Sequence, residues 1–200
     1  MPKITIDGRE IEVEQDLNLI LAAQRLGIEI PHYCYHPGLG VDGNCRMCLV
    51  EVEGARGLQI ACNTPLKDGL VVKTDTRMVQ KVRQGVLEFL LLNHPIDCPI
   101  CDQAGECWLQ DYYMRFGKHD NRLELQKVHK RKVQDIGPLV VLDQERCVLC
   151  SRCVRFCSKV SKTNELCITG RGDRSRVEIF PGQPVENLYS GNVVDICPVG

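Results

Sequence analysis

Apolar and polar residues alternate at the start of the chain. Residues 3–13 place apolar side chains at every second position on each side of Asp7-Gly8, at Ile4, Ile6, Ile11 and Val13. Alternation interrupted by Asp-Gly predicts a β-hairpin with a tight turn. Further short strands are predicted over residues 47–52, 58–61 and 70–73, where β-branched and other apolar residues gather.

One helix is predicted between the hairpin and the later strands. Asp16 is its candidate N-cap, apolar residues follow at helical spacing, and Gly27 ends it. Residues 31–44 are predicted to form a loop. One crossing helix with several strands predicts that residues 1–76 form an α+β, ubiquitin-like β-grasp roll.

The pattern changes to a helical period after residue 76. Apolar residues recur at helical spacing over 77–92, and His94-Pro95 ends this predicted helix because a residue before proline avoids helical geometry. A loop is expected over 93–107 and a second, short helix over 108–116. The polar, Lys- and Arg-rich residues 117–136 indicate a solvated connector rather than a binding surface, and a strand is predicted at Val140-Val141-Leu142.

Composition narrows the class of protein. The 200 residues carry a formal net charge of −1, so no basic excess points to nucleic acid. The richest apolar stretch, residues 86–92, contains Glu88, and no apolar run approaches the roughly 18 residues that a membrane-spanning helix needs. Aromatic residues are 5%, and Gly (17) and Pro (10) are frequent, so bound metal is expected to help stabilise the fold.

The 13 cysteines point to metal binding rather than to disulfides. Their number is odd, their spacings are those of metal sites, and the chain opens with a strand-like stretch at Lys3 instead of a signal peptide. We therefore expect a reducing compartment. Eleven of the cysteines and one histidine form three consecutive sets of four donors.

The first ligand set has the spacing C-x10-C-x2-C-x13-C and consists of Cys34, Cys45, Cys48 and Cys62. Four thiolates on a loop-rich frame suit a [2Fe–2S] cluster, although the long first gap departs from the plant-type C-x4-C-x2-C pattern. Glycines let backbone amides face the bridging sulfides, and the loop contains Gly38, Gly40 and Gly43. A four-Cys zinc site is an alternative, but such sites usually have two C-x2-C pairs and only one occurs here.

The second ligand set has the spacing H-x3-C-x2-C-x5-C and consists of His94, Cys98, Cys101 and Cys107. Three cysteines leave a four-iron cube one ligand short, and imidazole can bind iron in place of thiolate. We therefore predict a His-ligated [4Fe–4S] cluster. A Cys3His zinc site is the alternative for this segment.

The third ligand set consists of Cys147, Cys150, Cys153 and Cys197. The first three form the C-x2-C-x2-C run typical of ferredoxins, and Cys197 is a fourth ligand that is distant in the sequence. It predicts an all-Cys [4Fe–4S] cluster. Cys157 extends the run to C-x2-C-x2-C-x3-C, but the proline that usually follows the fourth cysteine comes after Cys197 instead. We expect Cys157 and Cys167 to be ordinary buried thiols; the alternative is a further cluster with ligands from elsewhere.

Three domains are predicted, one for each ligand set. Residues 1–76 would form a two-iron ferredoxin-like β-grasp domain, residues 77–136 a helical domain with the His-ligated cluster, and residues 137–200 a four-iron ferredoxin-like domain. The predicted fold class of the chain as a whole is therefore α+β.

Several stretches resemble one known family, and they are Cys45-Arg46-Met47-Cys48-Leu49-Val50, Leu92-Asn93-His94-Pro95-Ile96-Asp97-Cys98-Pro99, Arg146-Cys147, Arg152-Cys153-Val154-Arg155-Phe156 and Ser190-Gly191-Asn192-Val193-Val194-Asp195-Ile196-Cys197-Pro198-Val199-Gly200. The chain resembles the N-terminal iron–sulfur region of the large, G-type peripheral-arm subunit of NADH:quinone oxidoreductase, respiratory complex I. Related modules occur in NAD-reducing hydrogenases, [FeFe] hydrogenases and NAD-dependent formate dehydrogenases.

The resemblance implies one [2Fe–2S] and two [4Fe–4S] clusters at the three ligand sets. It also implies a flavoprotein partner subunit that oxidises NADH on FMN, other peripheral-arm subunits, and electron transfer toward quinone. The expected location is the cytoplasmic side, peripheral to the membrane and in contact with it only through partners. No nucleic-acid partner is expected.

The chain is predicted to relay electrons without an organic substrate site of its own. Gly170-Arg171-Gly172 is not a dinucleotide fingerprint, and no acid–base or nucleophile set stands out. Two alternatives remain: the relay arm of an NAD-linked hydrogenase or formate dehydrogenase, and a zinc-stapled scaffold that only binds partners.

Overall fold

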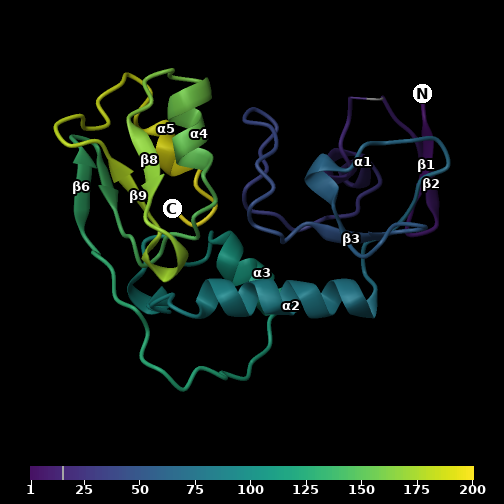
Figure 1. Ribbon diagram of the computed structural model, residues 1–200, viewed down its shortest axis with the longest axis horizontal. Coiled ribbons are helices and arrows are strands. Elements are labelled where there is room, and N and C mark those ends of the chain that lie inside the picture. Colours follow the sequence, from purple (N-terminus) through teal and green to yellow (C-terminus); the bar gives the residue numbers. More distant parts are fainter. Residues whose placement is uncertain (15) are drawn as a thin grey trace. The chain divides into compact units, whose positions relative to one another are not determined.

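The computed structural model describes residues 1–14 and 16–200. Contacts within the chain divide it into two compact units. Unit 1 comprises Met1–Tyr35 and Val41–Val86, and unit 2 comprises His36–Gly40 and Leu87–Gly200. Figure 1 shows the elements of both units by sequence position.

Unit 1 is built on a five-stranded sheet in the order β2-β1-β5-β3-β4. Its strands are β1 (Lys3–Ile6), β2 (Arg9–Glu12), β3 (Leu49–Val52), β4 (Gln59–Ile60) and β5 (Val71–Lys73). β1 pairs antiparallel with β2 and parallel with β5, whereas β3 pairs antiparallel with β4 and β5. This mixed sheet, packed against α1 (Leu19–Arg25), confirms the α+β class expected from the sequence.

The predicted hairpin is present, and its turn is Asp7-Gly8. Both residues have positive φ, 47° and 79°, which is the backbone geometry of a type I′ turn. The Asp7 carboxylate accepts hydrogen bonds from the amide (2.7 Å) and hydroxyl (2.5 Å) of Thr74. The turn is thereby joined to the end of β5, 67 residues later in the chain.

The first helix of unit 1, α1 (Leu19–Arg25), begins later than the sequence predicts. Asn18, not Asp16, is the N-cap, and its side chain accepts a hydrogen bond from the Leu21 amide at 3.1 Å. The predicted end is confirmed, because Gly27 has φ 72° and lets the Ile28 amide donate to the Ala23 carbonyl at 2.9 Å. A short 3-10 helix, η1 (Ala61–Asn63), follows β4.

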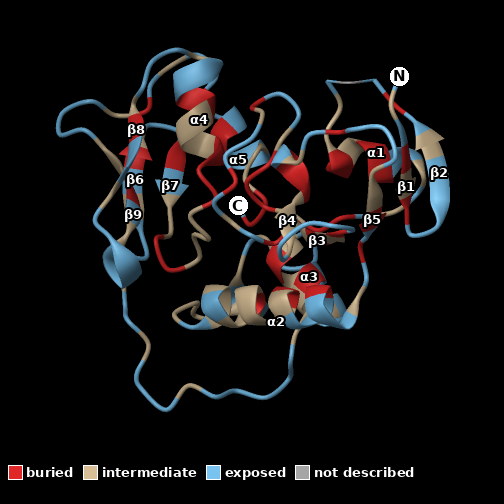
Figure 2. Ribbon diagram, turned by 45° about the vertical axis from the view of Figure 1, so that its right-hand side comes forward, coloured by how far each residue is buried: buried red, intermediate tan, exposed pale blue. Residues whose placement is uncertain are grey.

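The core of unit 1 lies between α1 and the sheet. Figure 2 shows buried residues on α1 and β1, whereas β2 is largely exposed. Charged side chains cover this edge strand, and Lys3 pairs with Glu10 across it at 2.6 Å. Charges on an edge strand disfavour pairing with other chains. The core itself comprises Ile4, Ile6, Val13, Leu19, Ile20, Ala22, Ala23, Ile30, Tyr35, Cys48, Val50, Val52, Ala61, Cys62, Leu66 and Val72.

Two helices follow at the positions predicted from the sequence. They are α2 (Arg77–Leu91), whose first turn is capped by the Thr76 hydroxyl on the Val79 amide at 3.3 Å, and α3 (Trp108–Phe116). A 3-10 turn, η2 (Cys98–Ile100), lies in the loop between them. No helix of the described residues is long and apolar enough to cross a membrane.

The last part of unit 2 contains two small antiparallel hairpins and two helices. The strands are β6 (Gln134–Gly137) with β7 (Val140–Leu142), and β8 (Leu166–Thr169) with β9 (Arg176–Ile179). The helices are α4 (Arg152–Lys159) and α5 (Asn192–Asp195), and a 3-10 turn, η3 (Gly172–Arg174), lies between β8 and β9. Only β7 among these elements is predicted from the sequence. Their shared core contains Leu39, Ile136, Val140, Phe156, Cys157, Leu166, Val177, Val185 and Val193.

Candidate iron–sulfur cluster sites

The first ligand set comes together in unit 1 as two pairs of cysteines. Cys34 hydrogen-bonds with Cys45, which lowers the pKa of Cys34 and raises that of Cys45. The Cys48–Cys62 hydrogen bond likewise lowers the pKa of Cys48 and raises that of Cys62. The other three sulfurs all contribute to the raised pKa of Cys62, so the four donors share one site.

Backbone amides line this first site. The amides of Cys45, Gly43 and Asn44 favour the thiolate of Cys34 and lower its pKa. Gly43 has φ 77°, and a Cβ there would lie 3.3 Å from the Ile60 side chain, so glycine suits this turn. Amides aimed at sulfur stabilise the negative charge that a thiolate–sulfide group carries. The donor set and its lining therefore fit a [2Fe–2S] cluster.

The three cysteines of the second ligand set lie around one loop of unit 2. Cys107 immediately precedes α3, and the amides of Gln110 and Leu109 in the first helical turn favour its thiolate. Burial outweighs these amides, and the charges of Cys101 and Cys98 add to it, so the pKa of Cys107 is raised. The sulfurs are therefore near enough to affect one another.

His94 lies half buried after the end of α2. Burial is the main cause that lowers the pKa of its imidazole, so the ring is neutral at pH 7. A neutral imidazole is the form that binds a metal. The histidine precedes the loop that carries the three cysteines, and its form fits the role of fourth ligand to a four-iron group.

The third ligand set is assembled from two distant segments. Cys147 and Cys150 lie in a loop, Cys153 lies on α4, and Cys197 follows α5. The loop winds through positive φ at Leu149 (53°), whose amide donates to the Cys147 sulfur at 3.4 Å. Burial raises the pKa of Cys153, and the charges of the other three sulfurs contribute to the same shift.

The donors of this third site are neutral thiols before any metal binds. Burial raises the pKa of Cys147, Cys150 and Cys197 to about 11 each. Iron takes thiolates, so binding must release these protons. Four sulfurs, that of Cys150 buried and the other three half buried, fit an all-Cys [4Fe–4S] cluster.

A site for a single metal ion differs in geometry from a site for a cluster. In residues 1–14 and 16–200, no three His, Cys, Asp or Glu side chains converge closely enough to hold one metal ion. An iron–sulfur cluster spreads its protein ligands over several iron atoms, so its donors need not converge on a single point.

The second and third ligand sets are neighbours within unit 2. The Trp108 amide donates to the Pro198 carbonyl at 3.0 Å, which joins the residue after Cys107 to the residue after Cys197. The charge of Cys107 contributes to the raised pKa of Cys197. The buried Arg152 guanidinium lies 4.6 Å from the Trp108 ring centre and donates to the Ile196 carbonyl at 3.3 Å.

The two remaining cysteines differ in their surroundings. Cys157 is fully buried in the core of unit 2, as expected, and burial raises its pKa to about 11. Cys167 is exposed, so the expectation of a buried thiol is wrong for it. Neighbouring residues of a strand face opposite sides, and in β8 it is Leu166 that faces the core.

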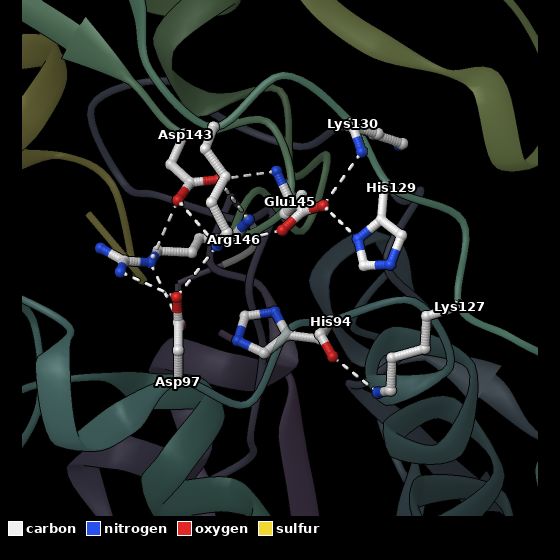
Figure 3. A network of polar contacts seen from close by, with 9 residues as sticks. His94, Asp97, Lys127, His129, Lys130, Asp143, Glu145 and Arg146 are labelled. Carbon is white, nitrogen blue, oxygen red and sulfur yellow. Dashed lines mark hydrogen bonds and ion pairs between the residues drawn. The ribbon is translucent and has the colours of Figure 1, made fainter.

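The connector over 117–136 is mostly exposed, as predicted for a solvated segment, but three of its lysines also bind other parts of unit 2. Lys127, Lys130 and Lys132 do not simply face solvent, because their ammonium groups bind other parts of unit 2. Lys127 Nζ donates to the carbonyls of Leu91 (3.0 Å) and His94 (2.6 Å). Figure 3 shows the contact with His94 and the ion pairs around it. Charge composition alone could not reveal these partners, because they are distant in the sequence.

Three family models match successive parts of the chain. Residues 2–77 match the 2Fe-2S iron-sulfur cluster binding domain, and residues 83–122 match the NADH-ubiquinone oxidoreductase-G iron-sulfur binding region. Residues 137–200 match the NADH-quinone oxidoreductase subunit 3, ferredoxin-like domain. Each matched range contains one complete ligand set, in the order first, second and third.

Relatives from bacteria and mitochondria agree with these matches. The G-type subunit of NADH-quinone oxidoreductase from Rickettsia bellii is 47% identical over 100% of this chain and 29% of its own length. The mitochondrial NADH-ubiquinone oxidoreductase 78 kDa subunit of Neurospora crassa is 46% identical over 99% of this chain and 27% of its own length. The chain thus spans less than a third of these relatives.

A chain of the NAD+-reducing [NiFe]-hydrogenase, solved in the H2-reduced state, has a similar structure. The TM-score is 0.88 at 31% identity, covering 100% of this chain and 85% of that chain. Together with the ordered family matches, this similarity extends over the whole chain. The chain belongs to the family of the G-type iron–sulfur subunits of NADH-quinone oxidoreductase.

Proposed function

We propose that this chain binds a [2Fe–2S] cluster at the first ligand set and [4Fe–4S] clusters at the second and third. In this role it relays electrons from an NADH-oxidising flavoprotein toward quinone. The observation that carries the proposal is the assembly of two complete four-cysteine sites and a His-plus-three-cysteine loop in the order of the family models.

When bound, iron–sulfur clusters accept and release one electron at a time. The residues of the chain supply the conditions for this chemistry. Amides at Cys34 offset negative charge, burial keeps water from the sulfur of Cys150, and neutral His94 leaves its site one charge less negative than four thiolates would.

The glycines at Gly170 and Gly172 support a role without a nucleotide site. They lie between β8 and β9 with φ of 71° and 61°, so they form a hairpin connection rather than a strand-to-helix phosphate loop. We therefore propose that FMN and NADH bind a partner flavoprotein subunit. Other peripheral-arm subunits would place the chain at the cytoplasmic side of the membrane.

The proposed organisation is one domain for each cluster, over residues 1–76, 77–136 and 137–200. The three family matches support this division, because each lies within one of these ranges or exceeds it by a single residue. Zinc binding at the same donors would instead make the chain a scaffold.

Metal analysis and EPR of the reduced protein test the proposal. Iron and acid-labile sulfide should each reach about ten per chain, with one two-iron and two four-iron EPR signals. His94→Ala should remove or alter one four-iron signal only. A colourless protein that contains zinc and no sulfide contradicts the relay function.

The relay arm of an NAD-linked hydrogenase is a second candidate, favoured by the structural similarity to the NAD+-reducing [NiFe]-hydrogenase. The complex that contains this chain should be isolated from its source and assayed with NADH plus quinone and with H2 plus NAD+. Quinone reduction by NADH supports the first candidate, and H2-dependent NAD+ reduction supports the second.

A further inference from the structure

The loop that carries His94 contains a strained residue. Ile96 has φ 54°, which a β-branched side chain rarely adopts. The residue is 55% exposed, so core packing does not hold this conformation. The strained backbone lies between His94 and Asp97, and surrounding groups must hold it in place.

Lys127 holds the loop before the strained residue. Its ammonium group donates to the carbonyl of Leu91, the last residue of α2, at 3.0 Å and to the carbonyl of His94 at 2.6 Å. The final carbonyls of a helix lack partners within the helix, and a lysine can satisfy them. Figure 3 shows the His94 carbonyl directed at this group.

The Asp97–Arg146 ion pair holds the loop after the strained residue. The Asp97 carboxylate accepts from Arg146 Nη2 at 3.0 Å and Nε at 3.3 Å, in a two-pronged contact. Asp97 precedes Cys98 of the second ligand set, and Arg146 precedes Cys147 of the third. This ion pair therefore links the segment that carries the second ligand set to the segment that carries the third.

Further charges hold this ion pair in place. Lys132 Nζ lies 2.9 Å from Asp97, 3.5 Å from Asp143 and 3.0 Å from Glu145. Asp143 also pairs with Arg146 at 3.2 Å, and the buried Glu145 lies 2.9 Å from the ring nitrogen of His129. Cations and carboxylates alternate around Asp97, so the loop has a defined position without core packing.

We propose that Lys127 and the Asp97–Arg146 pair form a clamp that positions His94 and Cys98 as ligands of the second cluster. The inference rests on the proposed function. These are positioning residues, since none of them is a donor to iron. The clamp holds a strained loop in the ligating conformation and places cationic groups beside it.

The test compares variants of the whole chain by iron content, EPR spectrum and the reduction potential of each cluster. Lys127→Met keeps the aliphatic stem and removes the donor, and Asp97→Asn keeps the shape and removes the charge. Each should cause a several-fold loss of the second-set EPR signal, or a shift of its spectrum and potential, while the first-set signal stays unchanged. Lys127→Arg should restore the signal because it keeps a charged donor.

Lys81→Met is the matched control, since Lys81 is an exposed lysine on the helix whose end Lys127 caps. It should leave all three clusters unchanged. Unaltered second-set signals in Lys127→Met and Asp97→Asn overturn the clamp, and so does an equal loss of all three clusters. If His94→Ala keeps the normal EPR signal of the second cluster, His94 is not a ligand and the proposed function is wrong at this site. If His94→Ala loses that signal while Lys127→Met and Asp97→Asn keep it, only the clamp is wrong.

Discussion

At the scale of single residues, burial, hydrogen bonds between thiols and backbone amides determine the protonation of the cysteines in the three ligand sets. Buried thiols such as Cys150 keep their protons at pH 7 because their pKa is raised to about 11. At Cys34 the thiolate is favoured, mainly by the hydrogen bond with Cys45 and further by backbone amides. Cysteine thus occurs in two kinds of environment. A buried, protonated thiol can bind a metal only when its proton is released.

The cap of α1 gives a prediction at this scale. Asn18→Ala removes the side-chain acceptor for the Leu21 amide and should lower the free energy of unfolding by about 1 kcal/mol. Asp16→Ala is the control, because Asp16 is not the cap residue and its loss should change stability by less than about 0.5 kcal/mol. Urea unfolding followed by circular dichroism measures both, and equal effects would contradict the observed cap.

Cys153 and Cys157 form a matched pair for the third ligand set. Cys153→Ala should remove about four irons per chain, because three thiolates remain in a site built for four. Cys157→Ala should leave iron unchanged and lower stability by about 1 kcal/mol, because it leaves a small cavity in the core of unit 2. Iron analysis and thermal unfolding separate the two outcomes. A loss of iron in Cys157→Ala would show that Cys157 is a ligand.

At the scale of elements, short strands and tight turns are held by side chains from distant positions. Asp7 binds Thr74 and so joins the β1–β2 turn to β5. Glu165, just before β8, accepts from the amides of Glu186 (3.1 Å) and Asn187 (3.2 Å). Such contacts give irregular segments a single conformation where no regular ladder exists.

Glu165 gives a pH prediction for its segment. Burial opposes ionisation, but hydrogen bonds from Thr163, Asn187 and the two amides outweigh it, so the pKa of Glu165 lies below its ordinary value. A lowered pKa stabilises the fold above the unfolded value of about 4.3, and this contribution is lost as pH falls through the folded value.

The measurement compares Glu165→Gln with the parent protein. The variant should have a lower Tm at pH 7, equivalent to about 1 kcal/mol, and the difference should shrink as pH falls below about 4.3 and through the folded pKa. Glu124→Gln is the control, since Glu124 is exposed. A difference in Tm that does not change with pH would show that the carboxylate charge is not what holds residues 186–187.

At the scale of the whole molecule, the two units differ in how much regular structure they contain. Unit 1 has a five-stranded sheet around its own core, whereas unit 2 has two separate two-stranded hairpins and short helices. We expect the fold of unit 2 to depend more on bound metal than that of unit 1, because metal-binding free energy contributes directly to folding.

Cluster removal tests this difference. Chelation of iron under mild oxidation should increase amide hydrogen exchange most strongly around residues 93–107, 147–153 and 192–200. The β1–β2 hairpin should change little, because its hydrogen bonds lie within the sheet. Mass spectrometry of the protein before and after cluster loss measures both effects. Equal loss of protection in the hairpin would contradict an independent core in unit 1.

The sequence by itself determined the hairpin and the helices α2 and α3, and it predicts the three donor sets. Each depends on spacing or periodicity among near neighbours, such as C-x2-C or apolar residues at helical intervals. Tertiary structure alone decided the parallel β1–β5 pairing, Asn18 as the cap, the exposure of Cys167, and the partners of Lys127 and Arg146. These features depend on which distant groups meet when the chain folds, and local pattern carries no information about such meetings.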